Sequence, residues 1–456
     1  MPWERLTMEK FVELVTIILY LLVITIIGFY TARKTKSATG FFLADRSIGW
    51  LPLMATITAT TVGGSATIVA GGRIFASGLP ALWYDIAGAL GLIILGIFIA
   101  KKIRKTNLFT LPDIIGSIYD QQTRYASAIL ILITEIAWIA LLIQASSFIL
   151  SVILPFDYFY LLLATTLVFI AYTLIGGQYA VIYTDIIQFL VMIIGILLIA
   201  TPLLLFKALP YLESLPTDYL SFPINTNIGL LSAGSIFFMM FLPHIVGPDI
   251  YSKLLSAKNT QSARKASIGA GIFKFLFAIS IGIIAIAAVV IPSIHSQVTV
   301  PALAIPLAIA SLPPIITGFV LASFLSVMMS SADSCLLSAG TILSVDIAKK
   351  HSMTISRIGI ISVGSAALAL AVYYTFLGGI LDTLELAYTV FTAGLTLPVL
   401  FGFYKEKTRV TSKGAKYSLI LGGISSLLWL HFAPFGEYAV LIGLIISLIP
   451  LLVFRP

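Results

Sequence analysis

Charged residues are scarce in this chain, and cysteine and histidine are almost missing. Asp, Glu, Lys and Arg make up only 10% of the 456 residues, whereas an ordinary soluble domain contains about a quarter. Hydrophobic residues make up 59%. The composition therefore predicts a membrane protein that crosses the bilayer many times and has essentially no soluble domain. The single cysteine, Cys335, excludes a disulfide within the chain.

The patterns of an enzyme or of an ATP-driven pump are also missing from the sequence. We find no His/Cys cluster with metal spacing, no nucleophile with a base nearby in sequence, and no phosphate-binding Walker loop. We therefore expect no catalytic residue and no cofactor, and transport would have to be driven by an ion gradient. A channel is disfavoured because no charged or carbonyl ring of a filter is recognisable. A membrane sensor is a further alternative, which would need a partner protein to signal.

Thirteen apolar segments are long enough to cross a bilayer, at roughly 20 residues for each crossing. They span residues 11–32, 48–72, 79–100, 125–154, 158–175, 180–206, 228–246, 267–291, 313–345, 355–376, 380–404, 415–432 and 438–454. The first segment is not followed by a small-residue cleavage site, so we expect a retained helix rather than a signal peptide.

The net charge of +8 is distributed unevenly along the chain. Lys and Arg gather in every second connection, at 33–46, 101–105, 253–265, 349–357 and 405–416. The positive-inside rule then places the N-terminus outside and the C-terminus in the cytoplasm of a cell with this protein in its plasma membrane. The positive charge is thus a sign of topology, and we expect the lipid bilayer, not nucleic acid, as a partner.

Two of the apolar segments contain residues that break helices. The first break lies in Ala-Thr-Thr-Val-Gly-Gly-Ser at 59–65, and the second in Leu-Pro-His-Ile-Val-Gly-Pro-Asp at 242–249. Gly and Pro free backbone carbonyls, which inside a membrane must line a cavity or find a partner. Because the two broken segments are five helices apart, they point to an inverted-repeat transporter with its site at the repeat interface. Ordinary glycine-mediated helix packing is the alternative.

The segment 313–345 carries hydroxyl groups and a carboxylate inside an apolar stretch. Ser330, Ser331, Ser334 and Ser338 share one face of a helix, and Asp333 lies among them. A carboxylate at membrane depth costs roughly 2.5–3.5 kcal/mol on insertion scales, and oxygen ligands suit a small hard cation. We interpret the cluster as a cation site. For each serine alone, close helix packing is the alternative.

A few other ionisable residues lie within the apolar segments, among them Glu135 and Asp185. We expect Lys274 to extend to the cytoplasmic edge of the membrane. Asp85 either pairs with Arg73 or leaves Arg73 to meet a substrate carboxylate. His244, between two helix breakers, is expected to be structural.

Four motifs in this chain resemble the sodium:solute symporter family, which includes Na+ symporters of the proline, choline and glucose type. The motifs are Ala-Asp-Arg-Ser-Ile-Gly at 44–49, Gly-Gly-Gln-Tyr-Ala-Val-Ile-Tyr-Thr-Asp-Ile-Ile-Gln at 176–188, Gly-Pro-Asp-Ile-Tyr-Ser-Lys-Leu-Leu-Ser-Ala-Lys at 247–258, and Val-Met-Met-Ser-Ser-Ala-Asp-Ser at 327–334. The resemblance implies an all-α fold of the LeuT type with a five-plus-five inverted repeat. Residues 1–456 would then form one transporter domain, with a leading helix at 11–32, repeats at 48–206 and 228–404, and two trailing helices at 415–454.

The resemblance also implies a sodium site between the segments 48–72 and 313–345. Its ligands would be the backbone carbonyls of Ala59, Val62 and Val327 and the hydroxyls of Ser330 and Ser331. A second site would contain Asp185, Asp333 and Ser334. At this second site, two aspartates either hold Na+ or share a proton.

The resemblance predicts sodium-coupled symport of a small organic solute, such as the amino acid proline, by alternating access. Alternatives are a proton-coupled symporter on the same fold and a choline-like or carboxylate solute. Because deep aromatic rings either pack or stack on a ligand, both outcomes stay open for each of them. The candidates for solute binding are Thr61, Gly64, Trp138, Phe241, Gly247, Tyr388 and Phe391. Arg46 matches a family arginine, and we expect it to act in gating.

Overall fold

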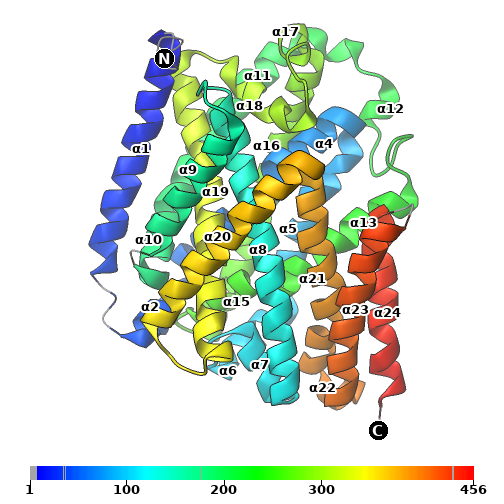
Figure 1. Ribbon diagram of the computed structural model, residues 1–456. Helices are drawn as coiled ribbons and strands as arrows, with labels where there is room; N and C mark the ends of the chain where they lie inside the picture. Colours follow the sequence, from blue (N-terminus) through cyan, green and yellow to red (C-terminus); the bar gives the residue numbers. More distant parts are fainter. Residues whose placement is uncertain (1–7, 34, 36, 175, 434–435, 456) are drawn as a thin grey trace.

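The computed structural model describes residues 8–33, 35, 37–174, 176–433 and 436–455. Within these residues the regular structure is helical, apart from one isolated bridge between Ile48 and Ala257. Most long helices run between two ends of the molecule, and the described chain starts at the upper end in Figure 1 and finishes at the lower end. An all-α membrane architecture was the prediction, and it is confirmed.

The predicted spans correspond to helices along the whole described chain. Their bounds are α1 (Met8–Ala32), α3 (Trp50–Val62), α4 (Ala70–Ser77), α5 (Trp83–Phe98), α8 (Gln121–Ser151), α9 (Tyr158–Thr173), α10 (Gly177–Met192), α11 (Thr201–Ala208), α13 (Leu230–Phe241), α14 (Pro243–Val246), α15 (Pro248–Leu255), α16 (Thr260–Val290), α19 (Pro314–Ile342), α20 (Met353–Leu377), α21 (Ile380–Phe403), α23 (Ser412–Phe432) and α24 (Ala439–Val453). Ile175, the predicted end of the 158–175 span, lies outside the described residues.

Nine helices of the described chain are long and apolar enough to cross a membrane, and a bent pair makes a tenth. The bent pair joins Trp50–Val62 to Ser65–Ser77 with an angle of 56°. The three other predicted spans are α23 and the shorter apolar helices α9 and α24.

The break in the first pair lies at Gly63 and Gly64, between α3 and a π-helical turn at Ser65–Val69. These glycines let neighbouring helices come close to the backbone. A Cβ atom at Gly64 would lie 3.0 Å from the Cβ of Ala145 in α8, and one at Gly63 would lie 3.0 Å from the Oγ of Ser331 in α19. The predicted interruption of this segment is confirmed.

The second broken segment extends further than the sequence analysis predicted. We expected a helix over 228–246 followed by a cytoplasmic loop, but the chain continues after Gly247 as the helix α15. Pro248 stands in the first turn of α15, where its missing N–H costs nothing. Lys253, which we assigned to the basic loop, lies on this helix and has only 1% of its side chain exposed. That assignment was wrong.

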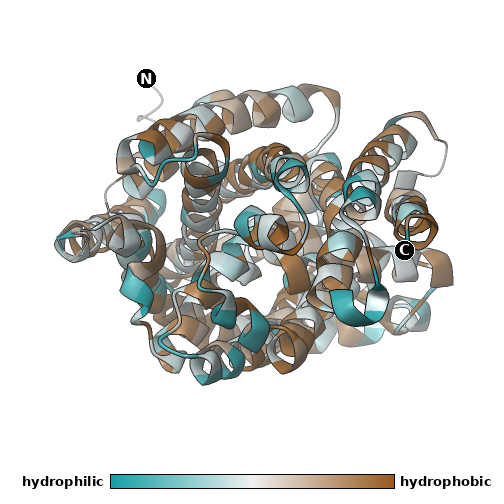
Figure 2. Ribbon diagram, turned by 90° about the horizontal axis from the view of Figure 1, so that it is seen from below, coloured by the Kyte–Doolittle hydropathy of each residue, from teal (hydrophilic) through white to brown (hydrophobic). Residues whose placement is uncertain are grey.

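The basic connections meet at one end of the molecule. Arg104 donates to the carbonyl of Ala257 at 2.6 Å, and Lys405 donates to the carbonyl of Ile118 at 2.6 Å. The short helices α6 (Ala100–Thr106) and α7 (Leu111–Ile118) lie at this lower end in Figure 1. Figure 2, seen from below, shows hydrophilic residues on connecting segments around largely hydrophobic helices. The predicted alternation of basic connections therefore corresponds to a real sidedness of the fold.

The helix α19, with its polar cluster, lies in the interior of the bundle. Every residue from Val320 to Ile342 is buried, and α1, α3, α8, α10 and α20 pack around this helix. By contrast, α1 exposes large apolar residues such as Phe11, Leu22 and Phe29, as a helix at a lipid boundary would. The polar residues of α19 are therefore surrounded by protein.

Candidate functional site

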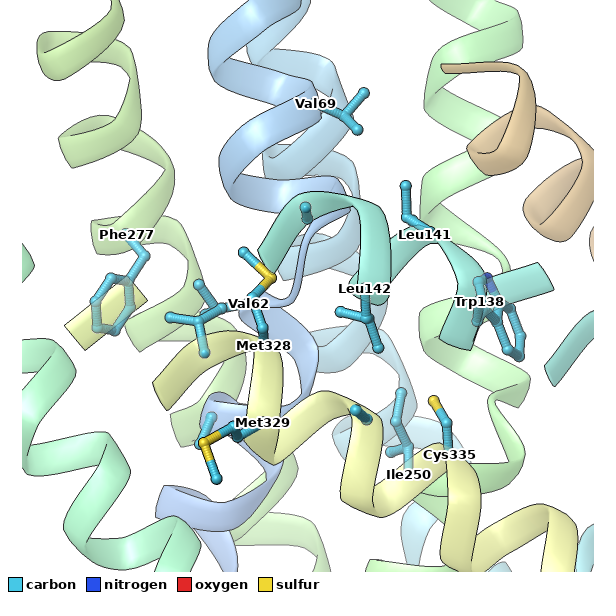
Figure 3. Close-up of a cluster of buried hydrophobic side chains, with 14 of the residues drawn as sticks. Val62, Val69, Trp138, Leu141, Leu142, Ile250, Phe277, Met328, Met329 and Cys335 are labelled. Carbon is cyan, nitrogen blue, oxygen red and sulfur yellow. The ribbon is translucent and has the colours of Figure 1, made fainter. Parts of the chain in front are cut away.

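A small cavity of about 60 Å³ lies where the two broken segments face each other. Both breaks contribute backbone and side chains to its wall, and α8, α19 and α21 complete it. The lining residues are Thr60, Thr61, Gly63, Gly64, Ser65, Trp138, Leu141, Leu142, Pro243, His244, Gly247, Asp249, Ile250, Ser331, Cys335 and Tyr388. Figure 3 shows five of them: Trp138, Leu141, Leu142, Ile250 and Cys335.

Five of the seven predicted solute residues line this cavity: Thr61, Gly64, Trp138, Gly247 and Tyr388. Phe391 packs on Trp138 with ring centroids 4.8 Å apart, although it is not itself a lining residue. Phe241 stacks on Phe237 at 5.0 Å and is not among the lining residues. The structure thus brings six of the seven together and leaves Phe241 outside.

Trp138 and Tyr388 form the aromatic side of the cavity. Their ring centroids are 5.4 Å apart in an edge-to-face arrangement. The Tyr388 hydroxyl lies 3.0 Å from the Ser65 hydroxyl, just after the first break. The indole N–H of Trp138 has no hydrogen-bond partner within the described part of the chain, so it is available to a solute.

The predicted sodium site lies at the meeting of α3 and α19. The Ser331 hydroxyl donates to the carbonyls of Thr60 at 2.6 Å and Val327 at 3.0 Å. The Thr60 hydroxyl lies 3.0 Å from that of Ser334 and 3.5 Å from that of Ser330. Uncharged oxygens of both helices therefore converge where α3 meets α19.

The other predicted ligands, Ala59 and Val62, flank Thr60 in the last turn of α3 and are fully buried. Thr60 itself was not predicted. Its position between two expected carbonyl ligands was a signal that could have indicated it. The role of these residues as sodium ligands stays a prediction.

The residues of the predicted second site have different partners in the structure. Asp185 contacts Thr56 and forms an ion pair with Lys253. Asp333 accepts a hydrogen bond from the Thr173 hydroxyl at 2.9 Å. Ser334 donates to the Ser330 carbonyl at 2.8 Å and faces Thr60. A shared cation or proton at this place stays a prediction.

Lys274 does not extend to the membrane edge, so that prediction was wrong. Its Nζ atom lies 2.5 Å from Asp85 Oδ1 and donates to the Thr61 carbonyl at 2.5 Å. Both charged side chains are at most 1% exposed. The helix break frees the Thr61 carbonyl, and Asp85 supplies the charge, so the ammonium has partners in the interior. Asp85 is consequently paired with Lys274 and not with Arg73.

His244 has a structural contact, as expected, and also lines the cavity. Its Nδ1 atom lies 2.7 Å from the Met240 carbonyl within the same broken segment. The contact holds the ring at the second break.

Two carboxyl groups near the cavity had not been assigned to the solute site. Asp249 lines the cavity from the first turn of α15. Glu135 is fully buried, and neither of its oxygens has a hydrogen-bond partner among the described residues. Its neighbours are Cys335, Ser338 and Asp249. The Gly-Pro-Asp sequence of the break was the available signal for Asp249.

Arg46 lies at the lower end, away from the cavity. Its guanidinium donates to the carbonyls of Asn107 at 2.7 Å and Leu108 at 3.1 Å, and lies 5.6 Å from the centre of the Phe109 ring. Partial burial and, secondly, the charge of Arg104 lower the pKa of Arg46. Arg46 therefore joins the segment before α3 to the loop before α7.

Solved structures with a similar fold are membrane transporters. A structure described as the substrate-bound outward-open state of a Na+-coupled sialic acid symporter matches with a TM-score of 0.80 and 18% identity, covering 98% of each chain. A nucleobase-cation-symport-1 family transporter with bromovinylhydantoin bound matches with a TM-score of 0.59 and 14% identity, covering 90% of this chain and 92% of the other. The fold is therefore that of the LeuT-type transporters.

The family follows from the sequence. The model of the sodium:solute symporter family matches residues 41–422, and this chain belongs to that family. A similar curated protein is the sodium/proline symporter of Staphylococcus aureus (strain bovine RF122 / ET3-1), which is 27% identical over 473 residues. That match covers 95% of this chain and 90% of the relative.

Proposed function

We propose that this protein couples sodium entry to the uptake of a small amino acid, with proline as the first candidate. One observation carries the proposal: the cavity between the two breaks directly adjoins the oxygens that converge at Thr60 and Ser331. Ser331 belongs to both groups, so a cation held there would touch the wall of the solute cavity. Occupancy of one site would then favour the other, which is the linkage that symport requires.

The ion site would use the carbonyls of Ala59, Val62 and Val327 with the hydroxyls of Ser330 and Ser331. These oxygens carry no formal charge, so they would hold Na+ loosely enough to release it. The Thr60 side chain, which faces Ser334 and Ser330, is available as a further oxygen ligand.

An amino acid fits the chemistry of the cavity wall. The partly exposed carboxylate of Asp249 can receive a solute ammonium group. The backbone N–H groups that begin the outer half of the first broken segment, near Ser65, suit a carboxylate, because a helix N-terminus carries partial positive charge. Trp138 and Tyr388 can cover the apolar part. The name of the Staphylococcus relative, a sodium/proline symporter, supports proline among the small amino acids.

A choline-like or carboxylate solute remains the alternative for substrate. Arg73 supports the carboxylate alternative, because it lines a larger cavity of about 510 Å³ above the site and its Nε has no hydrogen-bond partner in the described chain. Proton coupling through Asp185 and Asp333 is the alternative for the ion. It is less well supported, because Asp185 already has Lys253 as its charge partner.

We further propose the plasma membrane as the location, with the N-terminus outside and the C-terminus in the cytoplasm. The meeting of the basic connections at one end supports this orientation. The larger cavity at Arg73 would then open on the outer side. We also propose that the chain forms one transporter domain, with repeats at 48–206 and 228–404.

The test is thermal unfolding of the purified protein in sodium, potassium and choline chloride at equal ionic strength, with and without L-proline. A ligand at 100 times its Kd stabilises the folded state by about 2.7 kcal/mol. Sodium alone should raise the unfolding midpoint, and L-proline should raise it further only in sodium. Equal midpoints in all three salts would contradict sodium coupling. If sodium raises the unfolding midpoint but L-proline does not, the sodium site is supported and proline is rejected as the solute. Choline-like compounds and carboxylates would then be tested in its place.

A further inference from the structure

The ammonium group of Lys253 is enclosed inside the protein by three separate helices. Its Nζ atom lies 2.7 Å from Asp185 Oδ2 on α10 and donates to the Thr56 hydroxyl on α3 at 2.5 Å. Lys253 itself lies on α15. The side chains of Lys253 and Asp185 are 1% and 0% exposed.

Asp185 needs a positive charge in this place, because a buried carboxylate without a partner is strongly disfavoured. The Lys253 ammonium meets that need from within the chain. The Thr56 hydroxyl contacts Asp185 Oδ2 as well, so one carboxylate oxygen receives both interactions. The neutralisation of Asp185 therefore requires no ion from solution.

The Lys253 position and the proposed sodium site lie along the same face of α3. Thr56 precedes Thr60 by four residues, which is about one helical turn. Thr60 faces Ser334 and Ser330 with its hydroxyl and accepts from Ser331 with its carbonyl. A row of oxygens thus extends from Asp185 to Ser331. Its Asp185 end carries a formal charge that is already neutralised, and its Ser331 end has uncharged oxygens.

The other carboxyl group in this region is Asp333. It faces Thr173 on α9, and its second oxygen has no hydrogen-bond partner within the described residues. The cation near these two carboxylates is the Lys253 ammonium, and it is paired with Asp185. The structure therefore offers a tethered cation at the position where the family resemblance implied a second Na+ or a shared proton.

We propose that the Lys253 ammonium takes the place of a second coupling cation beside Asp185. One sodium ion, at the Thr60–Ser331 end, then moves with each solute molecule. The ammonium carries the same charge as Na+ and uses the same kind of oxygen partners, but its attachment to α15 prevents its release. The stoichiometry rests on the sodium-coupled function proposed above, whereas the role of Lys253 does not.

The first experiment measures the number of sodium ions per solute in proteoliposomes that contain the wild-type protein, from the membrane potential at which L-proline flux is zero. We expect a ratio of one and a Hill coefficient for sodium close to 1. A ratio of two would overturn the proposal. This measurement uses only the wild-type protein, so it tests the one-sodium stoichiometry even if a Lys253 variant fails to fold.

The second experiment replaces the tethered charge. In Lys253→Met, Asp185 becomes free to bind sodium, and the Hill coefficient should rise from about 1 towards 2. Lys253→Arg should keep it near 1, and so should the double variant Lys253→Met with Asp185→Asn. The matched control is Lys258→Met, an exposed lysine just after the same helix. A Lys253→Met protein that transports with an unchanged Hill coefficient would contradict the proposal.

Thermal unfolding in sodium and potassium chloride separates this inference from the proposed function. If the wild-type protein shows no sodium effect, the proposed sodium coupling fails. A sodium-dependent rise in the midpoint of Lys253→Met, absent from the double variant with Asp185→Asn, would even then support the role of Lys253. Identical midpoints in both salts for Lys253→Met would overturn it.

Discussion

The protein contains two buried lysine–aspartate pairs, and each is attached to the first broken segment in a different way. Lys253 and Asp185 contact the side chain of Thr56, within the regular part of α3. Lys274, which is paired with Asp85, donates to the backbone carbonyl of Thr61 near the end of α3. The first pair joins α15 to α10, and the second joins α16 to α5.

The difference indicates two roles for the same pair of residue types. Lys274 satisfies a carbonyl that the helix break has released, and such a carbonyl inside a membrane protein is costly without a partner. We therefore interpret the Lys274 pair as a support of the break and of the cavity beside it. Lys253 satisfies no freed carbonyl and lies in line with the proposed sodium ligands. We therefore interpret the Lys253–Asp185 pair as part of the cation-binding region and not as a support of the helix break.

The largest effect should come from breaking the Lys274 pair. Lys274→Met leaves Asp85 buried without a cation and the Thr61 carbonyl without its donor, and removal of one partner of a buried pair costs about 3–5 kcal/mol. We expect a lower unfolding midpoint that sodium does not restore, in contrast to Lys253→Met. Differential scanning fluorimetry in detergent measures it. Lys265→Met, an exposed position on the same helix, is the control, and a midpoint equal to wild type in Lys274→Met would refute the supporting role.

The next effect concerns the sodium end of the oxygen row. Ser331→Ala removes a hydroxyl that lies 2.6 Å from the Thr60 carbonyl. The loss of one polar interaction with a charged group is worth about 1.5–3 kcal/mol, so the sodium concentration for half-maximal uptake should rise about 10- to 150-fold. Ser323→Ala is the matched control, because that buried hydroxyl bonds within α19 to the Phe319 carbonyl. Equal sodium dependence in the two variants would remove Ser331 from the site.

A smaller effect is expected at the aromatic wall beside the Lys274 pair. Tyr388→Phe keeps the ring and loses the hydroxyl that lies 3.0 Å from Ser65. A neutral hydrogen bond contributes about 0.5–1.5 kcal/mol, so the KM for the solute should rise about 2- to 10-fold with little change in sodium dependence. Uptake of labelled L-proline measures it. Phe241→Leu, outside the cavity lining, should leave the KM near wild type, and a larger effect there than at Tyr388 would argue against this cavity.

The smallest effect is expected from Arg46, near the start of the helix that carries Thr56. Arg46→Lys keeps the charge but cannot reproduce the two-pronged contact with the carbonyls of Asn107 and Leu108. We expect the maximal uptake rate to change 2- to 3-fold, about 0.5 kcal/mol at this half-buried site, with unchanged sodium and solute affinities. Single-turnover and steady-state uptake distinguish rate from affinity. An altered affinity with an unchanged rate would exclude a gating role.

The sequence was most informative where one local property decides the structure. The apolar segments predicted the helices because a stretch of about 20 apolar residues can lie in lipid only as a helix. Gly63 and Gly64 predicted the first break for a similar reason, since glycine stabilises helices poorly. Thr61, Gly64 and Gly247, which lie at or beside these breaks, were expected in the solute site from the family resemblance, and the structure places all three in the cavity wall.

The sequence was least informative about charges. Lys253 and Lys274 were assigned to a loop and to the membrane edge, because hydropathy records how a side chain interacts with water and lipid. Each of these lysines instead has an aspartate from a distant part of the chain, 68 residues away for Lys253 and Asp185. No local pattern contains that information.

The sequence by itself determined the class of protein, the order of its apolar spans along the chain, and the places where two of them break. Those features depend on the solubility of each segment in a bilayer and on the backbone freedom of glycine and proline. The tertiary structure alone decided which buried charges neutralise each other and which oxygens are left for a mobile ion. Such pairing depends on distances of a few ångströms between helices far apart in the chain, and in a low-dielectric interior those distances decide whether a charge can remain.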